Sequence, residues 1–190
     1  MSDCIDLAIL AEGYTEAERD KFYKDCERAV EALFAWEPFK SLKDRFNVVA
    51  VAAPSMHSGP SVGKNAKDLQ LFTNYSTFYS DRYLTTKDMH KVYDLLSGVP
   101  FEHIMILCNT DIYGGGGIYN QVLVATSDHP MFKEVFVHEF GHSYAGLADE
   151  YAYDDMDSEW YPADVEPWEP NITTRADQDK GERIGRYEGG

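Results

Sequence analysis

The alternation of apolar and polar positions along the chain predicts a succession of strands and helices. Four short apolar runs have the length and the bounding turn residues of buried strands: residues 4–13, 46–54, 102–110 and 121–127. Apolar residues recur at helical intervals over residues 15–36, and residues 85–98 indicate a second helix with Gly98 at its end. Because strands and helices alternate in this way, we predict an α/β fold with a mixed sheet and helices packed on it.

Two local signals refine this pattern. Thr15 and Glu18 have the spacing of a capping box, which predicts that a helix begins at this point. Residues 111–120 read "DIYGGGGIYN", and four consecutive glycines are costly to hold in a regular element. We therefore expect a turn or flexible loop there. An alternative is that this segment forms the edge strand of the sheet, where an extended peptide could add as a further strand.

A helix is also predicted over residues 129–146, with Ser127 or Asp128 as its cap and Pro130 in its first turn. Beyond Tyr153 the periodicity fades into an acidic segment broken by prolines. The C-terminal part is therefore expected to be rich in loops.

Length and composition narrow the class of protein. The chain has 190 residues, 44% hydrophobic and 26% charged, which suits one globular domain with a sizeable core. We expect a single domain over residues 1–190. Lys and Arg total 17 against 33 Asp and Glu, a net charge of -16. Because such a charge repels phosphates and anionic lipids, nucleic acids and membrane surfaces are poor partners.

The chain also lacks several features of other classes. Cys4, Cys26 and Cys108 form an odd and sparse set, which argues against a disulfide framework. No apolar run approaches the ~20 residues that cross a bilayer, and the first ten residues lack the basic start of a signal peptide. The compartment is left undetermined by these observations.

The chemistry concentrates in residues 138–151, "HEFGHSYAGLADEY". On a helix, residues four apart lie about 40° apart around the axis and about 6 Å along it. His138 and His142 therefore project from one face and can both bind a single ion, and Glu139 can take a proton from metal-activated water. This is the H-E-x-x-H arrangement of zinc metallopeptidases.

A catalytic zinc needs a third protein ligand and one open position. Gly146 can end the helix in a left-handed turn and bring the chain back towards the ion. Asp149 then lies close enough in sequence to bind, with Glu150 as its rival. Glu159 and Glu166 are more distant candidates.

These residues resemble a known family. The chain resembles the bacterial IgA-peptidase family of zinc metallopeptidases over residues 6–190. The resemblance is carried by the string at 138–151, by "YGGGGIYN" before it and by the early "LAILAEGYTEAE". The resemblance implies a zincin fold related to metzincins: a mixed twisted sheet, an active-site helix and a third ligand after a glycine turn. It implies that His138, His142 and Asp149 bind zinc and that Glu139 is the general base.

Two positions depart from the metzincin pattern. That pattern places its third ligand six residues after the second histidine, where this chain has Ala148, so one extra residue moves the acid to Asp149. The methionine turn of metzincins has a weak counterpart in Met156. The family typically continues beyond "GRYEGG", so we expect the far wall of its cleft to lie outside a C-terminally truncated chain.

Three functions follow from these patterns. The first is a zinc endopeptidase that acts on a protein or glycoprotein. The family resemblance names immunoglobulin as one substrate and suggests that the protein is secreted or lies at the cell surface. The second is a binding module that the metal only stabilises, in which a fourth protein ligand closes the site. The third is a zinc hydrolase of small amides.

Other polar groups are candidates for an oxyanion site, a calcium site or further metal ligands. Tyr151 and Tyr153 lie near the ligands and could stabilise an oxyanion, but packing is the favoured interpretation. The acidic run "DEYAYDDMDSE" has the oxygen ligands of a calcium site without its spacing, so a solvated segment is favoured. The remaining histidines lack ligand spacing and are interpreted as surface or capping residues: His57, His90, His103 and His129.

Overall fold

A computed structural model describes residues 4–62, 67, 69–77, 81–150, 161–162 and 164–174. The chain divides into two compact units, residues 1–144 and 145–190. The expected single domain over residues 1–190 stays a prediction. In the described part, no helix is both long enough and apolar enough to cross a membrane.

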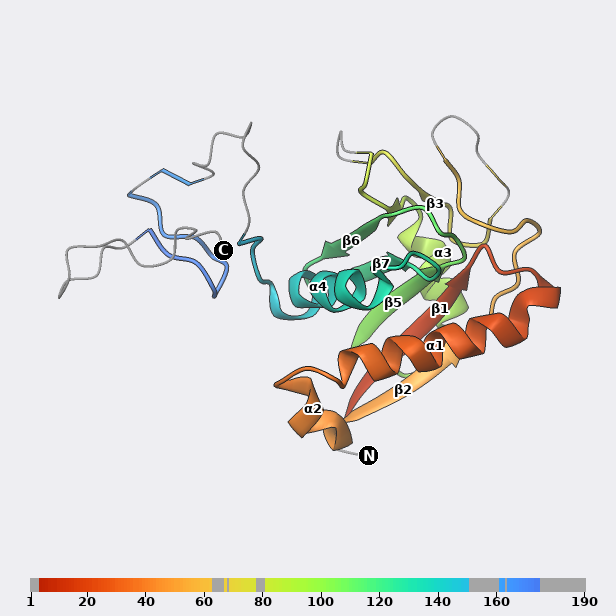
Figure 1. The fold of residues 1–190 in the computed structure, drawn as a ribbon, viewed down its shortest axis with the longest axis horizontal. Coiled ribbons are helices and arrows are strands. Elements are labelled where there is room, and N and C mark those ends of the chain that lie inside the picture. The colour runs from red at the N-terminus through yellow and green to blue at the C-terminus, as the bar shows by residue number, and fades with distance from the viewer. Residues whose placement is uncertain are drawn as a thin grey trace. The chain divides into compact units, whose positions relative to one another are not determined.

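The first unit is built on a five-stranded mixed sheet in the order β2-β1-β5-β7-β6 (Figure 1). Its strands are β1 (Ile5–Glu12), β2 (Phe46–Val51), β5 (His103–Cys108), β6 (Gly115–Ile118) and β7 (Val122–Thr126). The first four strands in that order pair in parallel, and β6 pairs antiparallel with β7 at the edge. All four strands predicted from apolar runs are confirmed. A separate pair, β3 (Thr73–Asn74) and β4 (Thr85–Thr86), is antiparallel.

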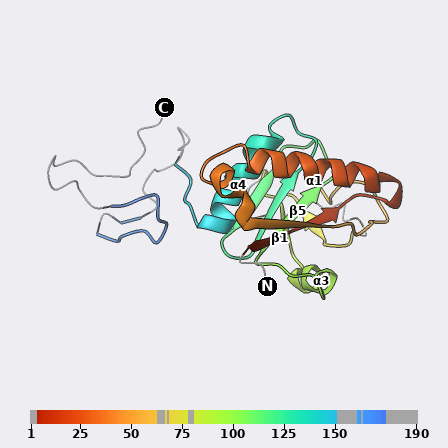
Figure 2. The same cartoon turned by 90° about the horizontal axis from the view of Figure 1, so that it is seen from below.

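Helices cover both faces of this sheet. They are α1 (Arg19–Leu33), α2 (Phe39–Leu42), α3 (Met89–Leu95) and α4 (Phe132–Ala145), with 3-10 turns η1 (Glu16–Glu18) and η2 (Lys43–Arg45). The apolar sides of α1 and α4 share one core with one face of the sheet, and α3 packs in a second core on the other face. Figure 2 shows α1 and α4 on one side and α3 on the other. The predicted α/β class is therefore confirmed.

The central strands are apolar throughout because both of their faces are buried. In β1, Leu7 and Ile9 enter the core beneath α1 and α4, while Ala8 and Leu10 enter the core beneath α3. All four side chains have 0% exposure. This explains why the alternation of apolar and polar residues is weak in the sequence of β1.

The capping-box spacing before α1 corresponds to real contacts. The Glu18 carboxylate accepts hydrogen bonds from Thr15 N at 2.9 Å and from Thr15 Oγ1 at 2.8 Å. These bonds close the short 3-10 turn η1, from which α1 continues. At the end of α3, Gly98 has φ +83°, as expected for a glycine that ends a helix.

The prediction for the glycine-rich segment is wrong in its main form. Residues 115–118 are strand β6, in antiparallel register from Gly115↔Ala125 to Ile118↔Val122. A Cβ at Gly114 would lie 2.5 Å from the Tyr75 ring, and one at Gly116 would lie 2.6 Å from Leu84 O. The glycines are therefore required by close packing, which outweighs their cost in a strand, and the alternative of an edge strand is confirmed.

The predicted start of the last helix is also corrected. Helix α4 begins at Phe132, so Pro130 precedes it. Phe132 N donates to His129 O at 2.9 Å, and Met131 N donates to His129 Nδ1 at 3.1 Å. Asp128 instead accepts a hydrogen bond from Lys21 Nζ at 2.9 Å. His129 thus satisfies the start of α4, in agreement with its interpretation as a capping residue.

Candidate metal centre

Helix α4 turns three phenylalanines into the core and two histidines away from it. Phe132, Phe136 and Phe140 recur every four residues and are at most 1% exposed. His138 is exposed and His142 is partly buried. Four residues make slightly more than one turn, so the apolar side chains and the two imidazoles occupy separate stripes of the helix. The packing of α4 therefore fixes where the imidazoles point.

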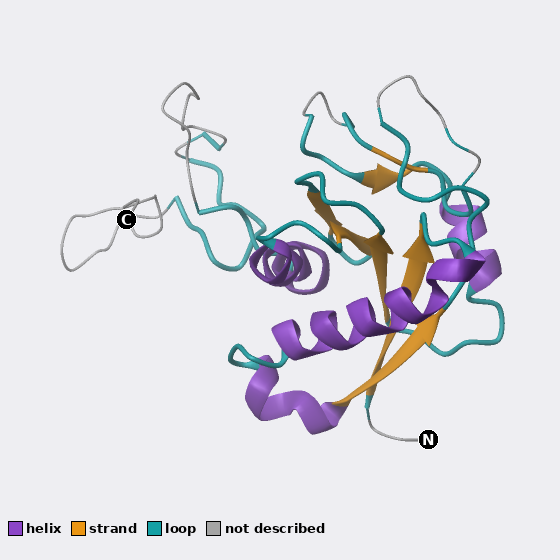
Figure 3. Ribbon diagram, turned by 45° about the vertical axis from the view of Figure 1, so that its right-hand side comes forward, coloured by secondary structure: helices purple, strands orange, loops and turns teal. Residues whose placement is uncertain are grey.

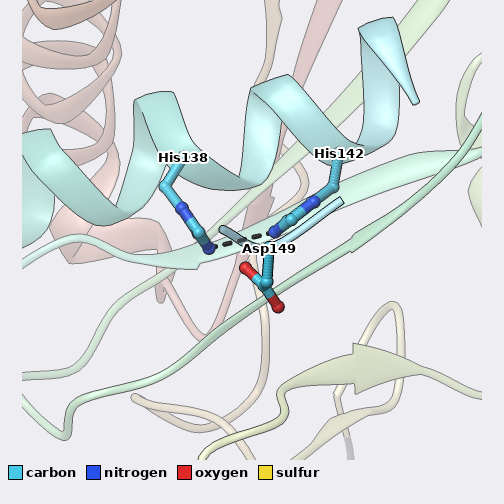
Figure 4. Close-up of side chains that lie close together, drawn as sticks. All are labelled: His138, His142 and Asp149. Carbon is cyan, nitrogen blue, oxygen red and sulfur yellow. Dashed lines mark hydrogen bonds between the residues drawn. The ribbon is translucent and has the colours of Figure 1, made fainter. Parts of the chain in front are cut away.

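The two imidazoles meet as their spacing predicts. His142 Nε2 lies 3.0 Å from His138 Nε2, and the ring centroids are 4.5 Å apart with an angle of 87° between the ring planes. Figure 4 shows the two Nε2 atoms directed at each other beneath the helix. Two nitrogen ligands of one tetrahedral zinc lie about 3.3 Å apart, so this spacing fits a shared ion.

Asp149 follows α4 after a left-handed glycine. The helix ends at Ala145, and Gly146 has φ +66°, as the sequence predicts for the turn. One ligand atom each from His138, His142 and Asp149 lies within 4.8 Å of the other two (Figure 4). Two imidazoles and one carboxylate are a ligand set that zinc binds in catalytic sites. These three residues therefore fit the requirements of the metal.

The rival acids bond elsewhere. Glu150 Oε1 accepts a hydrogen bond of 2.6 Å from Asn171 Nδ2. Glu166 Oε1 accepts one of 2.6 Å from Thr173 Oγ1. Four other candidates near the motif lie outside the residues that the structure describes: Tyr151, Tyr153, Met156 and Glu159.

Strand β6 lies directly against the side of α4 that carries Glu139. A Cβ at Gly115 would lie 2.8 Å from Glu139 Oε1 and 2.9 Å from Val135 Cγ1. One at Gly117 would lie 2.4 Å from Glu139 O, 2.9 Å from His142 Cβ and 3.2 Å from Glu139 Oε2. The glycines therefore let the backbone of β6 reach the carboxylate of Glu139, which is partly buried.

A buried histidine holds the last turn of α4. His103, at the start of β5, is 4% exposed, and its Nε2 lies 3.0 Å from Ser143 Oγ. Burial lowers the pKa of His103 to about 4, so the ring is neutral at pH 7. Its interpretation as a surface or capping residue is wrong. Ser143 O also accepts a hydrogen bond from Asn120 N at 2.8 Å, so both β5 and the β6–β7 turn fix the helix beside His142.

A comparison with protein families identifies the class of this chain. The family model for IgA Peptidase M64 matches residues 1–184, which is nearly the whole chain. The chain belongs to the IgA peptidase M64 family. Members of this family are metallopeptidases, so the M64 chain is a hydrolase with a protein substrate, and its fold is compatible with a zincin-like peptidase domain. No curated protein matches the M64 chain.

Sequence reasoning missed two contributions to this centre of the M64 chain. The close approach of Gly115 and Gly117 to Glu139 could have been found from the run of glycines. Every second residue of a strand faces the same side, so these two glycines share one face. His103 carried no such signal. A lone histidine at the start of an apolar run does not reveal that a serine from α4 will meet it.

Proposed function

We propose that this protein is a zinc-dependent endopeptidase in which His138, His142 and Asp149 hold the metal and Glu139 is the general base. The observation that carries the proposal is the pair of facing imidazoles on α4, 3.0 Å apart, with Glu139 on the same helix. A helix that is anchored through its phenylalanines keeps this geometry before substrate arrives.

Each residue has a defined task. Zinc, when bound, supplies a Lewis acid that polarises the scissile carbonyl and lowers the pKa of water. The Glu139 carboxylate accepts the proton of the attacking water and delivers it to the leaving amine. The backbone of β6 at Gly115 and Gly117 restricts where the Glu139 carboxylate can move, since it leaves no room even for a Cβ.

The substrate is proposed to be a protein or glycoprotein bound in extended form along β6. Edge strands recognise peptides by main-chain hydrogen bonds, and β6 is the edge strand that lies beside Glu139. Immunoglobulin is one candidate substrate because the family is described as an IgA peptidase. Casein serves as a general protein substrate in the test.

The decisive experiment combines metal analysis with cleavage of casein and immunoglobulin. The zinc-loaded wild type is compared with Glu139→Gln and with Glu134→Gln, which removes an exposed acid from the first turn of the same helix. We expect one zinc per chain in all three proteins. Loss of a general base costs roughly 10²–10⁴-fold in rate, so kcat/KM should fall by that factor in Glu139→Gln and stay unchanged in Glu134→Gln.

Two results would contradict the proposal. Full activity in Glu139→Gln with zinc retained would show that this carboxylate is not the base. Zinc binding by the wild type without cleavage of either protein would favour the alternative of a metal-stabilised binding module. Cleavage restricted to small amides would favour the third function.

A further inference from the structure

The outward edge of β6 is already occupied at one position. In an antiparallel strand, the N–H and C=O of each residue point to the same side, and the side alternates along the strand. Gly115 N donates to Arg82 O at 3.3 Å, and Leu84 N donates to Gly115 O at 3.0 Å. These two bonds form a parallel bridge between Tyr83 and Gly115. Gly115 therefore cannot pair with a substrate while this bridge is intact.

The segment that makes this bridge, Arg82–Leu84, is built into the fold. Leu84 is 0% exposed and belongs to the core beneath α3. Tyr83 O accepts a hydrogen bond from Thr77 Oγ1 at 3.0 Å, which ties the segment to the chain that follows β3. Directly after Leu84 the chain enters β4 and pairs with β3 (Figure 3). Displacing the segment would expose a buried leucine, which is costly.

Among the described residues, the backbone pairing of this segment with β6 ends at Leu84. Leu84 O turns onto the face of β6 at Gly116, where it would lie 2.6 Å from a Cβ. Gly117 is two residues beyond Gly115, so its N–H and C=O point to the same outward edge. The bridge does not include Gly117. Gly117 also lies against Glu139 and His142, so a peptide paired there passes beside the candidate metal ligands.

We propose that Arg82–Leu84 ends the substrate-binding edge, so that β6 pairs with one residue of substrate backbone, at Gly117. This inference rests on the proposed peptidase function and deepens it. The substrate is a peptide whose chain bends or ends just beyond the paired residue on the Gly115 side. A long, straight extended strand would collide with Arg82–Leu84.

The same geometry makes Tyr83 a specificity-determining residue. Paired residues of neighbouring strands point their side chains to the same face of the sheet. Tyr83 pairs with Gly115, and a Cβ at Gly115 would point towards α4. The Tyr83 side chain therefore belongs on the α4 side of the edge, and the residue is 42% exposed. A tyrosine offers an apolar ring with a polar tip, so it selects an apolar or aromatic substrate side chain at the bend.

Amide hydrogen exchange tests the edge without measuring activity. In the free protein, we expect the Gly115 amide to exchange more slowly than the Gly117 amide, because Gly115 N donates to Arg82 O. A peptide that spans a bond cleaved by the wild type in casein is then added to zinc-loaded Glu139→Gln. Protection should increase at Gly117 and stay unchanged at Gly115. Equal exchange of the two amides in the free protein, or new protection at both, would overturn the inference.

Backbone methylation of the substrate provides a second test. Quenched fluorescent peptides are prepared with one N-methylated residue each, outside the scissile bond. Loss of one hydrogen bond should lower kcat/KM about two- to tenfold at a single position along this edge. Losses at two positions, two residues apart, would mean that Gly115 also pairs with substrate and that Arg82–Leu84 moves away.

The role of Tyr83 is tested by Tyr83→Ala beside Tyr93→Ala, which truncates a similarly exposed tyrosine on α3. Across peptides varied at the bend, Tyr83→Ala should reduce the preference for aromatic over small side chains about tenfold or more, the value of a well-filled apolar contact. Tyr93→Ala should leave it unchanged. An unaltered preference in Tyr83→Ala rejects the role of Tyr83. If zinc-loaded wild type cleaves no peptide, the proposed function fails, and the exchange of the free protein still tests the bridge.

Discussion

Glu12 and Glu139 are two carboxylates of the same unit in contrasting surroundings. Glu12 ends β1 and is 0% exposed, and burial raises its pKa to about 7. Its Oε2 accepts hydrogen bonds from Leu71 N at 2.9 Å and Thr73 N at 3.3 Å. Glu139 lies on α4, partly buried, against a strand without side chains. Glu12 thus supports the protein's own backbone, whereas Glu139 is the proposed general base.

Under the proposed function, the carboxylate with the raised pKa is structural and the general base lies elsewhere, so a perturbed pKa by itself does not identify a catalytic group. Strands β1 and β5 are neighbours, and the chain continues from them towards opposite edges of the sheet. In open α/β sheets, ligands usually bind at the carboxyl ends of two such strands. Here Glu12 joins that edge to the segment around Leu71. Two of the three candidate metal ligands, His138 and His142, instead lie on α4, which packs against the antiparallel edge strand.

The largest effect should follow from removing an imidazole beside Glu139. His142→Ala is expected to lower zinc affinity more than about 100-fold, beyond the loss typical of a supporting residue, because it removes a direct ligand. Titration with a competing chelator measures this affinity. His90→Ala, which removes an exposed histidine from α3, should bind zinc as the wild type does. Equal affinity in both variants would refute the metal centre.

A second experiment separates the neighbouring acids. Asp149→Ala should lower zinc affinity by at least about tenfold, while Glu150→Ala should leave it unchanged because Glu150 bonds to Asn171. The same chelator titration applies. The reverse order of effects would assign the third ligand to Glu150.

The pH dependence of stability tests the assignment of Glu12. Its pKa is about 7 in the folded protein and about 4.5 when exposed, so the folded state binds more protons between these values. Stability from this group is present below pH ~4.5 and is lost as the pH rises through ~7, by up to about 3 kcal/mol. Denaturant unfolding of wild type and Glu12→Gln at several pH values measures the difference. Parallel pH profiles would show that Glu12 does not titrate in this way.

A fourth experiment adds one methyl group on the Glu139 side. Gly117→Ala overfills the contact with α4 and should cost about 1–3 kcal/mol, with a fall in kcat/KM. Gly98→Ala has open space but a left-handed backbone, so it should cost about 1 kcal/mol and leave kcat/KM unchanged. Unfolding curves and peptide cleavage measure both. Unchanged activity in Gly117→Ala would mean that β6 does not restrict Glu139.

By itself, the sequence determined the parts that depend on local periodicity. The apolar runs predicted four of the five strands of the main sheet, and the spacing of His138 and His142 predicted their convergence, because both rest on the repeat of one strand or one helix. The left-handed turn at Gly146 followed from the same local reasoning.

Only the tertiary structure decided the contacts between distant segments. Three such contacts depend on how separate elements pack. Gly115 and Gly117 face Glu139, His103 contacts Ser143, and Arg82–Leu84 pairs with part of β6. Glycine has no side chain, so its position in the sequence does not predict which residue it will contact. A polar residue in an apolar run likewise does not indicate its hydrogen-bond partner. The physical reason is that such contacts are set by close packing across the fold, which no local repeat encodes.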